Sequence, residues 1–408
     1  MESEPRIQRE AGMTSRTRWG AFGALLVVLA LAVATVGTGL GGSQTDAAAP
    51  IVIGWAFDSK GNMAPFDGPA LAAAKIRIGQ INAKGGVVGR PLKIETCDTN
   101  NNNPAKAKSC AASLLGKGAH IVFTTCDVDF ATPVVQESLK AGKLTVAPCI
   151  GTDQMGPKRF GKAGKLAFSF GNVAQDEGSA MAEYAYRKGW RTANLATNTL
   201  LVYFKNVVRA FEVRFKQLGG KIAGRESYAT GANNVNTAVS RLNGRKADVI
   251  ITSTAFGELP ALVSGLRSLG NKTPILNSWA GDGTYWLTKS PQVTDYYAVT
   301  FASAFGDDPN KAVRALAKKL KAFTGGFVTG SAAIDGVATA IRRSGGSTNG
   351  ATLAATMEKF KKVPTLSGLV SFSPQFHTVF GRQYRVIKIH NNKARYVGAV
   401  TAKVVPKI

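Results

Sequence analysis

Histidine is scarce in this sequence of 408 residues, which contains only His120, His377 and His390. So few imidazoles leave little material for a histidine-based metal site. The sequence also lacks an HExxH zinc motif, a GxSxG nucleophile motif and a P-loop. The only glycine-rich candidate, GTGLGG at 37–42, closes an apolar N-terminal segment and does not support dinucleotide binding. We therefore predict no enzymatic activity, metal or cofactor.

Acidic residues are also few. The chain has 25 Asp and Glu against 51 Lys and Arg, which gives a formal net charge of +26. The basic residues are scattered, so nucleic acid is not an expected partner. Two readings stay open, namely attraction to acidic cell-wall polymer or an anionic membrane surface, and a charge that only keeps the protein soluble. An apolar content of 45% permits a sizeable core and excludes general disorder.

The first 49 residues have the pattern of an export signal. A polar stretch with four arginines leads into 21–40, which carries no charge, and small residues follow at Ala47 and Ala49, where a peptidase could cut. The apolar run is about as long as a membrane-spanning helix, so an uncleaved anchor is the alternative. Both readings predict an exported, extracytoplasmic protein.

All four cysteines fall in the first third of the chain, and an even number in an exported protein favours two disulfides. Their spacing is not that of a CxxC pair, so zinc is not expected. Cys97 ends an expected strand and Cys110 lies on the following helix. Cys126 and Cys149 each lie at or just past a strand end. Of the three connectivities, these positions favour Cys97–Cys110 and Cys126–Cys149, although Cys110 could instead be a small core residue.

Strands and helices alternate through the body of the chain, which is typical of parallel sheets covered by helices. The first series has strands at 51–57, 91–97, 120–125 and 144–148, with helices around 71–81, 107–115 and 131–142. The second has strands at 166–171, 192–197, 221–228, 248–253 and 273–277, with helices at 175–188, 207–218, 234–243 and 257–269. Helices at 310–323, 330–343 and 351–360 then precede β-like runs at 368–372, 383–390 and 395–401.

This pattern predicts an α/β protein with two Rossmann-like lobes and a C-terminal tail that returns to both of them. In open sheets of this kind, ligands bind outside the carboxyl ends of the strands. The residues alone therefore indicate an exported binder with a cleft between its lobes.

Three segments resemble the leucine/isoleucine/valine-binding family of periplasmic solute receptors, namely 81–115 with its INAKGG helix end, 247–276 and 331–341. The resemblance implies a type I periplasmic binding fold with a three-crossover hinge. Lobe 1 would comprise 50–165 and 302–366, and lobe 2 would comprise 166–301 and 367–408. It also implies a monomer without a catalytic centre, which delivers an amino acid or related solute to the membrane permease subunits of an ABC importer. The alternative is a sensor of the same fold that signals lobe closure to a membrane partner without transport.

The same resemblance places the candidate ligand-binding residues. In lobe 1 it implies that the turn after the third strand, Thr124, Thr125 and Cys126, holds a ligand carboxylate. The turn after the fourth strand contributes Ile150, Gly151 and Thr152, and a loop aromatic matches Phe66. In lobe 2 the matching positions are Asn198, Tyr203, Phe256, Trp279 and Asp282.

The sequence departs from the family where an amino-acid ligand would need a charged partner. The carboxylate that pairs with the ligand ammonium aligns with Trp279, and Asp282 is the nearest acid that could replace it. A buried ammonium without a partner is costly. Trp55, Phe66, Tyr203, Phe256 and Trp279 would form an aromatic cleft, unless each ring only packs in the core. We therefore expect an aromatic or larger apolar ligand, and the basic balance of the chain would allow an anionic one.

Overall fold

The computed structural model describes residues 48–229 and 231–408. The predicted export signal or anchor at 1–49 lies almost wholly outside these residues and stays a prediction. Within the described part of the chain, no helix is both long enough and apolar enough to cross a membrane.

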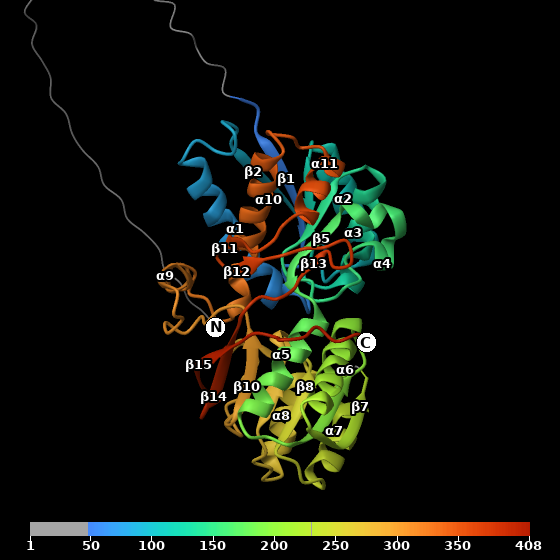
Figure 1. The fold of residues 1–408 in the computed structure, drawn as a ribbon, viewed down its shortest axis with the longest axis vertical. Coiled ribbons are helices and arrows are strands. Elements are labelled where there is room, and N and C mark those ends of the chain that lie inside the picture. Colours follow the sequence, from blue (N-terminus) through green and yellow to red (C-terminus); the bar gives the residue numbers. More distant parts are fainter. Residues whose placement is uncertain (1–47, 230) are drawn as a thin grey trace, which may run out of the picture. The chain divides into compact units, whose positions relative to one another are not determined.

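The first sheet has six strands in the order β13–β5–β4–β3–β1–β2, and all its pairings are parallel. Its strands are β1 (Ile51–Phe57), β2 (Leu92–Asp98), β3 (Ile121–Phe123), β4 (Leu144–Ala147), β5 (Ala167–Asn172) and β13 (Thr378–Val379). The helices of this half are α1 (Ala64–Asn82), α2 (Pro104–Gly116), α3 (Val128–Lys140), α4 (Pro157–Phe160), α10 (Val328–Arg343) and α11 (Gly350–Glu358). Figure 1 shows these elements together in one half of the molecule, which we call lobe 1.

The second sheet has seven strands in the order β15–β14–β10–β9–β8–β6–β7. They are β6 (Thr192–Asn198), β7 (Lys221–Tyr228), β8 (Val249–Ser253), β9 (Ile275–Asn277), β10 (Tyr296–Thr300), β14 (Tyr384–His390) and β15 (Lys393–Val400). With α5 (Ala174–Arg187), α6 (Val202–Gln217), α7 (Ala232–Asn243) and α8 (Glu258–Ser268) it forms lobe 2. The sheet is mixed, because β14 and β15 join it antiparallel. Strand β10 was not predicted from the sequence.

The predicted lobe boundaries differ from the observed sheets. Strand β5 pairs with β4, so the chain leaves lobe 1 after Asn172 and not at 165/166. A short two-stranded sheet, β11 (Val363–Thr365) and β12 (Gly368–Val370), precedes β13. Strand β13 pairs with β5 of lobe 1, although the prediction assigned 367–408 to lobe 2. The chain therefore passes between the sheets after β5, after β10 and after β13, which confirms the three-crossover topology.

A buried arginine ties the first and third crossovers together. Arg382 is 1% exposed, and its Nε–H donates to Asn172 Oδ1 at 2.8 Å. Beside it, Asp176 accepts hydrogen bonds from the Gly381 N–H and the Tyr384 hydroxyl, both at 3.0 Å. Burial raises the pKa of Asp176 to about 6. The two crossovers are thus held as one hydrogen-bonded unit.

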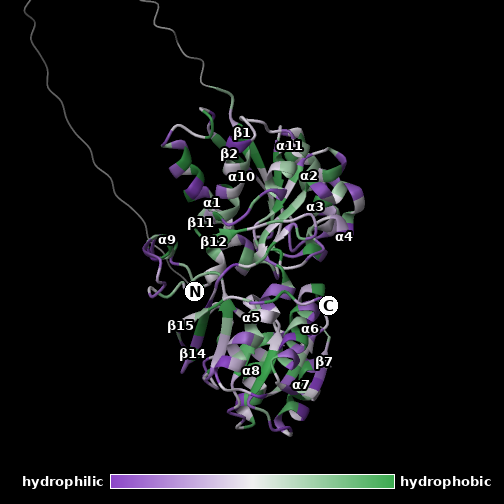
Figure 2. Ribbon diagram, viewed as in Figure 1, coloured by the Kyte–Doolittle hydropathy of each residue, from purple (hydrophilic) through white to green (hydrophobic). Residues whose placement is uncertain are grey.

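Apolar residues are concentrated on the strands and on the helix faces that cover them, while polar residues dominate the outer helix faces (Figure 2). One buried cluster includes side chains of both lobes, among them Met63 and Phe66 from lobe 1 and Trp279 and Phe301 from lobe 2. Contact between apolar groups of the two lobes removes both from water, which favours the lobes meeting here.

Both predicted disulfides are present. Cys97–Cys110 joins β2 to α2 with a Cα–Cα distance of 5.5 Å. Cys126–Cys149 joins the turns after β3 and β4, with a Cα–Cα distance of 4.8 Å. Neighbouring parallel strands bring their carboxyl ends side by side, so the second bond fixes the edge of the sheet that faces lobe 2.

Candidate functional site

A small pocket lies between the two lobes, where loops and the first turns of α1 and α6 follow the carboxyl ends of strands in both sheets. Eleven residues line it. Five are predicted site residues, namely Phe66, Cys126, Tyr203, Phe256 and Trp279. The other six are Met63, Asp127, Leu201, Phe204, Ala255 and Ala280. Its free space is about 20 Å³, which is room for about one water. A larger ligand therefore enters only if the lobes part or side chains move.

Aromatic rings from both lobes form the wall of this pocket. The Phe66 ring of lobe 1 lies 5.1 Å from Trp279 and 6.4 Å from Phe256 of lobe 2, measured between centroids. Tyr203 and Trp279 are 6.4 Å apart. The ring pairs meet at interplanar angles of 64–88°, so they form walls of different orientation instead of a parallel stack.

Phe256 has an unusual backbone conformation. It lies between β8 and α8 with φ at 56°, in the left-handed region that a bulky side chain seldom adopts. Strained backbone persists where the surrounding structure imposes it, and such positions cluster at ligand clamps. Here the strain accompanies a ring that lines the pocket.

Glu177 lies directly behind the aromatic wall. It lies in the first turn of α5 and is 1% exposed. It accepts hydrogen bonds from the backbone N–H of Trp279 at 2.6 Å and from the Tyr203 hydroxyl at 2.8 Å. Burial raises its pKa to about 8. This residue was not predicted from the sequence. The available signal was a pair of acids in a helix start that directly follows a buried strand.

Two further carboxyl groups lie on the lobe 1 side of the pocket. Asp67 accepts from the Cys126 N–H at 3.0 Å and the Asp58 N–H at 2.8 Å. Asp127 caps α3, since its Oδ1 accepts from the N–H groups of Asp129 at 2.8 Å and Phe130 at 3.3 Å. Burial raises the pKa of both Asp67 and Asp127 to about 7. The Cys126 N–H, one donor of the turn expected to hold a ligand carboxylate, is therefore already bound by the protein's own acid.

The other predicted residues of lobe 1 lie close by but do not line the pocket. Thr124, Thr125, Ile150 and Thr152 are buried. Gly151 has a packing role, because a Cβ there would come within 2.5 Å of the Tyr203 ring. A residue without a side chain is therefore needed for that ring to reach its position.

In lobe 2, Asn198 and Asp282 hold loops. Asn198 accepts from the Leu200 N–H and donates to the Thr254 hydroxyl, both at 2.9 Å. Asp282 Oδ2 accepts from the hydroxyls of Thr300 at 2.7 Å and Thr324 at 2.8 Å. It therefore fixes the crossover after β10, whereas the sequence offered it as a substitute partner for a ligand ammonium.

Trp55 is also absent from the pocket. The side chain is fully buried in the core of lobe 1, where its ring centroid lies 4.8 Å from that of Phe123. Its position on β1 places it before the strand ends. The core-packing alternative for this ring is the one that the structure supports.

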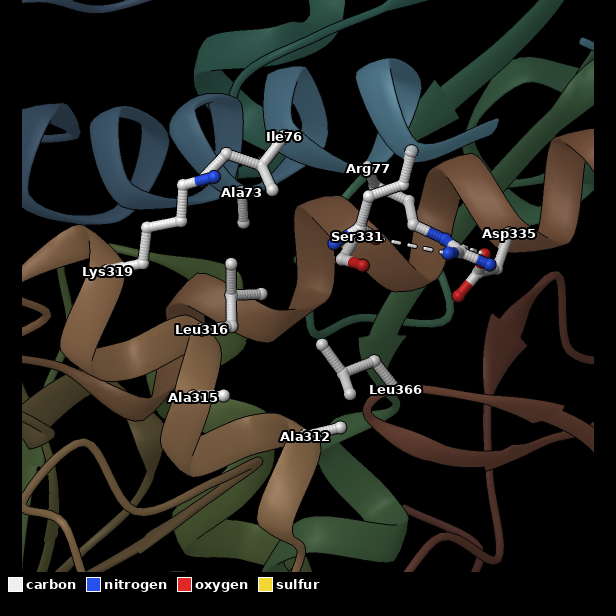
Figure 3. A pocket seen from close by; sticks show the side chains of 11 residues that line it. Ala73, Ile76, Arg77, Ala312, Ala315, Leu316, Lys319, Ser331, Asp335 and Leu366 are labelled. Carbon is white, nitrogen blue, oxygen red and sulfur yellow. Dashed lines mark hydrogen bonds and ion pairs between the residues drawn. The ribbon is translucent and has the colours of Figure 1, made fainter. Parts of the chain in front are cut away.

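A larger groove of about 390 Å³ lies between α1, α10 and α9 (Lys311–Leu320), shown in Figure 3. Alanine, isoleucine and leucine side chains cover much of it, and Arg77 pairs with Asp335 across it at 2.6 Å. It contains no predicted site residue. The described residues include no cluster of His, Cys, Asp and Glu that could hold a metal ion.

Comparisons with known proteins agree with this architecture. A model of the periplasmic binding protein family matches residues 50–394. The Leu/Ile/Val-binding protein BraC3 of Rhizobium johnstonii is 22% identical over 335 residues, covering 76% of this chain and 86% of that protein. The Leu/Ile/Val-binding protein homolog 3 of Brucella melitensis is 22% identical over 340 residues, covering 81% and 89%.

Two solved structures illustrate the shared fold. The leucine-binding protein LivK of Thermotoga maritima aligns with a TM-score of 0.74 at 17% identity, covering 86% of this chain and 99% of that one. A solute-binding protein of an ABC transporter from Rhodopseudomonas palustris, in complex with 3,4-dihydroxybenzoic acid, aligns with a TM-score of 0.72 at 16% identity, covering 88% and 99%. The type I periplasmic binding fold predicted from the sequence is thereby confirmed.

Proposed function

The chain belongs to the periplasmic binding protein family, and on this basis we propose that it is the extracytoplasmic solute-binding receptor of an ABC transporter. It captures a small solute between its lobes and presents it to the membrane permease subunits. The matched proteins whose names state a role are binding or transport proteins, which favours transport over a sensor of the same fold.

The observation that carries this proposal is a pocket whose wall comes from both lobes. Phe66 and Cys126 belong to lobe 1, whereas Tyr203, Phe256 and Trp279 belong to lobe 2. A solute bound there would touch both lobes only when they meet. Its binding free energy would then shift the population toward the closed form by the difference in affinity between the two forms.

The wall also bears on the type of solute. Rings and apolar side chains make up most of the lining, which suits an amino acid or another organic solute with apolar surface. The solved relatives include one in complex with isoleucine and one with 3,4-dihydroxybenzoic acid. We propose a ligand of comparable size for this chain.

A thermal-shift screen of the purified protein tests the proposal. The panel contains amino acids, aromatic acids, amides and small organic cations. A ligand at 100 times its dissociation constant should stabilise the protein by about 2.7 kcal/mol. Small-angle scattering with and without the best hit should then show a more compact form with ligand. A panel without any hit would contradict a receptor function, and a hit that leaves the scattering unchanged would contradict closure of the lobes on the ligand.

A further inference from the structure

We propose that the pocket selects a small organic cation whose ammonium group is methylated, an inference that rests on the proposed function. The charges of the lining residues favour a cation. The chain as a whole carries +26, yet no lysine or arginine lines the pocket and its one acidic residue is Asp127. The local charge is thus opposite in sign to that of the molecule.

The aromatic wall supports the same ligand class. Phe66, Tyr203, Phe256 and Trp279 converge from two lobes with centroids 5.1 to 6.4 Å apart for the pairs in contact. The face of an aromatic ring is electronegative and attracts a cation within about 6 Å of its centroid. Rings that stand at steep angles to one another can surround one cationic group from several sides.

An anion would find few donors here. Two backbone N–H groups near the pocket already bind carboxylates of the protein, because Cys126 donates to Asp67 and Trp279 donates to Glu177. An anionic ligand would have to displace one of these acids, or lie beside the Asp127 carboxylate with the indole N–H of Trp279 as its one unpaired side-chain donor among the lining residues. Either arrangement compensates a buried negative charge poorly, which is costly.

A methylated ammonium fits better than a primary one. A primary ammonium has three N–H donors, each of which needs an acceptor when it is buried. The lining side chains offer mainly Asp127 Oδ2, which accepts no hydrogen bond from the described residues, while the Tyr203 hydroxyl is committed to Glu177. A fully methylated, quaternary ammonium spreads its charge over methyl groups and has no N–H donor to leave unpaired. The sequence resemblance also implies that Trp279 stands where a family acid would pair with a primary ammonium.

Calorimetric titration of the full chain at pH 8 with four probes tests this selectivity. Choline supplies the trimethylammonium group, and 3,3-dimethylbutan-1-ol has the same shape with carbon in place of nitrogen. The third probe, 3,3-dimethylbutanoate, is the anion, and leucine supplies a primary ammonium. We expect choline to bind at least about tenfold more tightly than the neutral alcohol, because only choline carries the positive charge that Asp127 and the ring faces attract.

Two variants separate the ligand role of Asp127 from its helix-capping role. Asparagine caps a helix as well as aspartate and cannot ionise, so Asp127→Asn should keep or raise the melting temperature at pH 8 while it weakens choline binding about tenfold. Phe256→Leu keeps apolar volume but removes a ring face, and it should weaken choline about fivefold with little change for the alcohol. Glu137→Gln, which removes one half-buried acid near the far end of α3, is the matched control and should bind choline as the parent does.

The outcomes distinguish the inference from the function on which it rests. If the alcohol, the anion or leucine binds as tightly as choline, or if Asp127→Asn binds choline unchanged, the cation selectivity is wrong and the receptor function stands. The same holds if all four probes fail while another member of the thermal-shift panel binds. If no compound of any class binds, both proposals are wrong.

Discussion

Glu177→Gln should flatten the pH dependence of stability. Burial raises the pKa of this carboxyl from 4.5 to about 8, so the folded protein holds the proton more tightly than the unfolded chain does. The stability from this proton is fully present below pH 4.5 and is lost as the pH rises through about 8. A glutamine keeps the size and an acceptor for the Trp279 N–H but cannot ionise.

The magnitude follows from proton linkage. Each tenfold change in proton affinity corresponds to about 1.4 kcal/mol, so ionised Glu177 costs the folded state on the order of 5 kcal/mol above pH 8. Between pH 5 and pH 7 the group contributes a loss of about 1.4 kcal/mol of unfolding free energy per pH unit. Asp67 and Asp127, with pKa values of about 7, act in the same direction. The parent protein should therefore be more stable at pH 5 than at pH 8.

Urea unfolding of parent and variant at pH 5, 6 and 7 measures these slopes. Glu177→Gln should reduce the slope by about 1.4 kcal/mol per pH unit. Glu137→Gln serves as the control, because its carboxyl is on the surface beside Lys140 at 2.9 Å, which lowers its pKa below this pH range. Equal slopes in parent and Glu177→Gln would refute the assignment of a buried, protonated carboxyl behind the pocket.

Three further changes test the crossovers, the cleft edge and the wall. Arg382→Met leaves Asn172 and neighbouring acceptors unpaired, so it should lower the free energy of unfolding by urea by about 3 kcal/mol. A loss near zero would show that the crossovers are not held by this side chain. Replacing Cys126 and Cys149 together by serine opens a bond with a sequence separation of 23 and should lower the unfolding free energy by about 3 kcal/mol; an unchanged melting curve would contradict a formed disulfide. Trp279→Ala leaves a cavity at a position that is 4% exposed. It should lower the unfolding free energy of the ligand-free protein by about 3 kcal/mol, which calorimetry can check.

Much of the fold was predictable because its signals are local. Alternating apolar runs and helical stripes located the strands of the first series, and the cysteines at their ends indicated the correct pairing. Strand β10 escaped because Tyr296–Thr300 is a short run without a helix directly after it. The boundary at β5 was placed too early, since a buried strand has the same sequence pattern in either sheet.

The site was predictable only in part. Position relative to the strand ends pointed to Phe66, Tyr203, Phe256 and Trp279, which line one pocket. The same reasoning also pointed to Asp282, which fixes a crossover. Glu177 escaped because an acid in the first turn of a helix is ordinarily a solvated N-terminal charge. The sequence of α5 does not show that Tyr203 and Trp279, which lie much later in the chain, cover Glu177.

Periodicity and turn residues, which act over a few neighbours, were enough to place most strands and helices, the two-lobed α/β architecture and the edge where loops gather. Packing in three dimensions sets which rings face the pocket, which backbone donors are already occupied and which carboxyls keep their protons. Those properties depend on desolvation and hydrogen bonding by groups that are distant in sequence, such as Glu177 beneath Trp279.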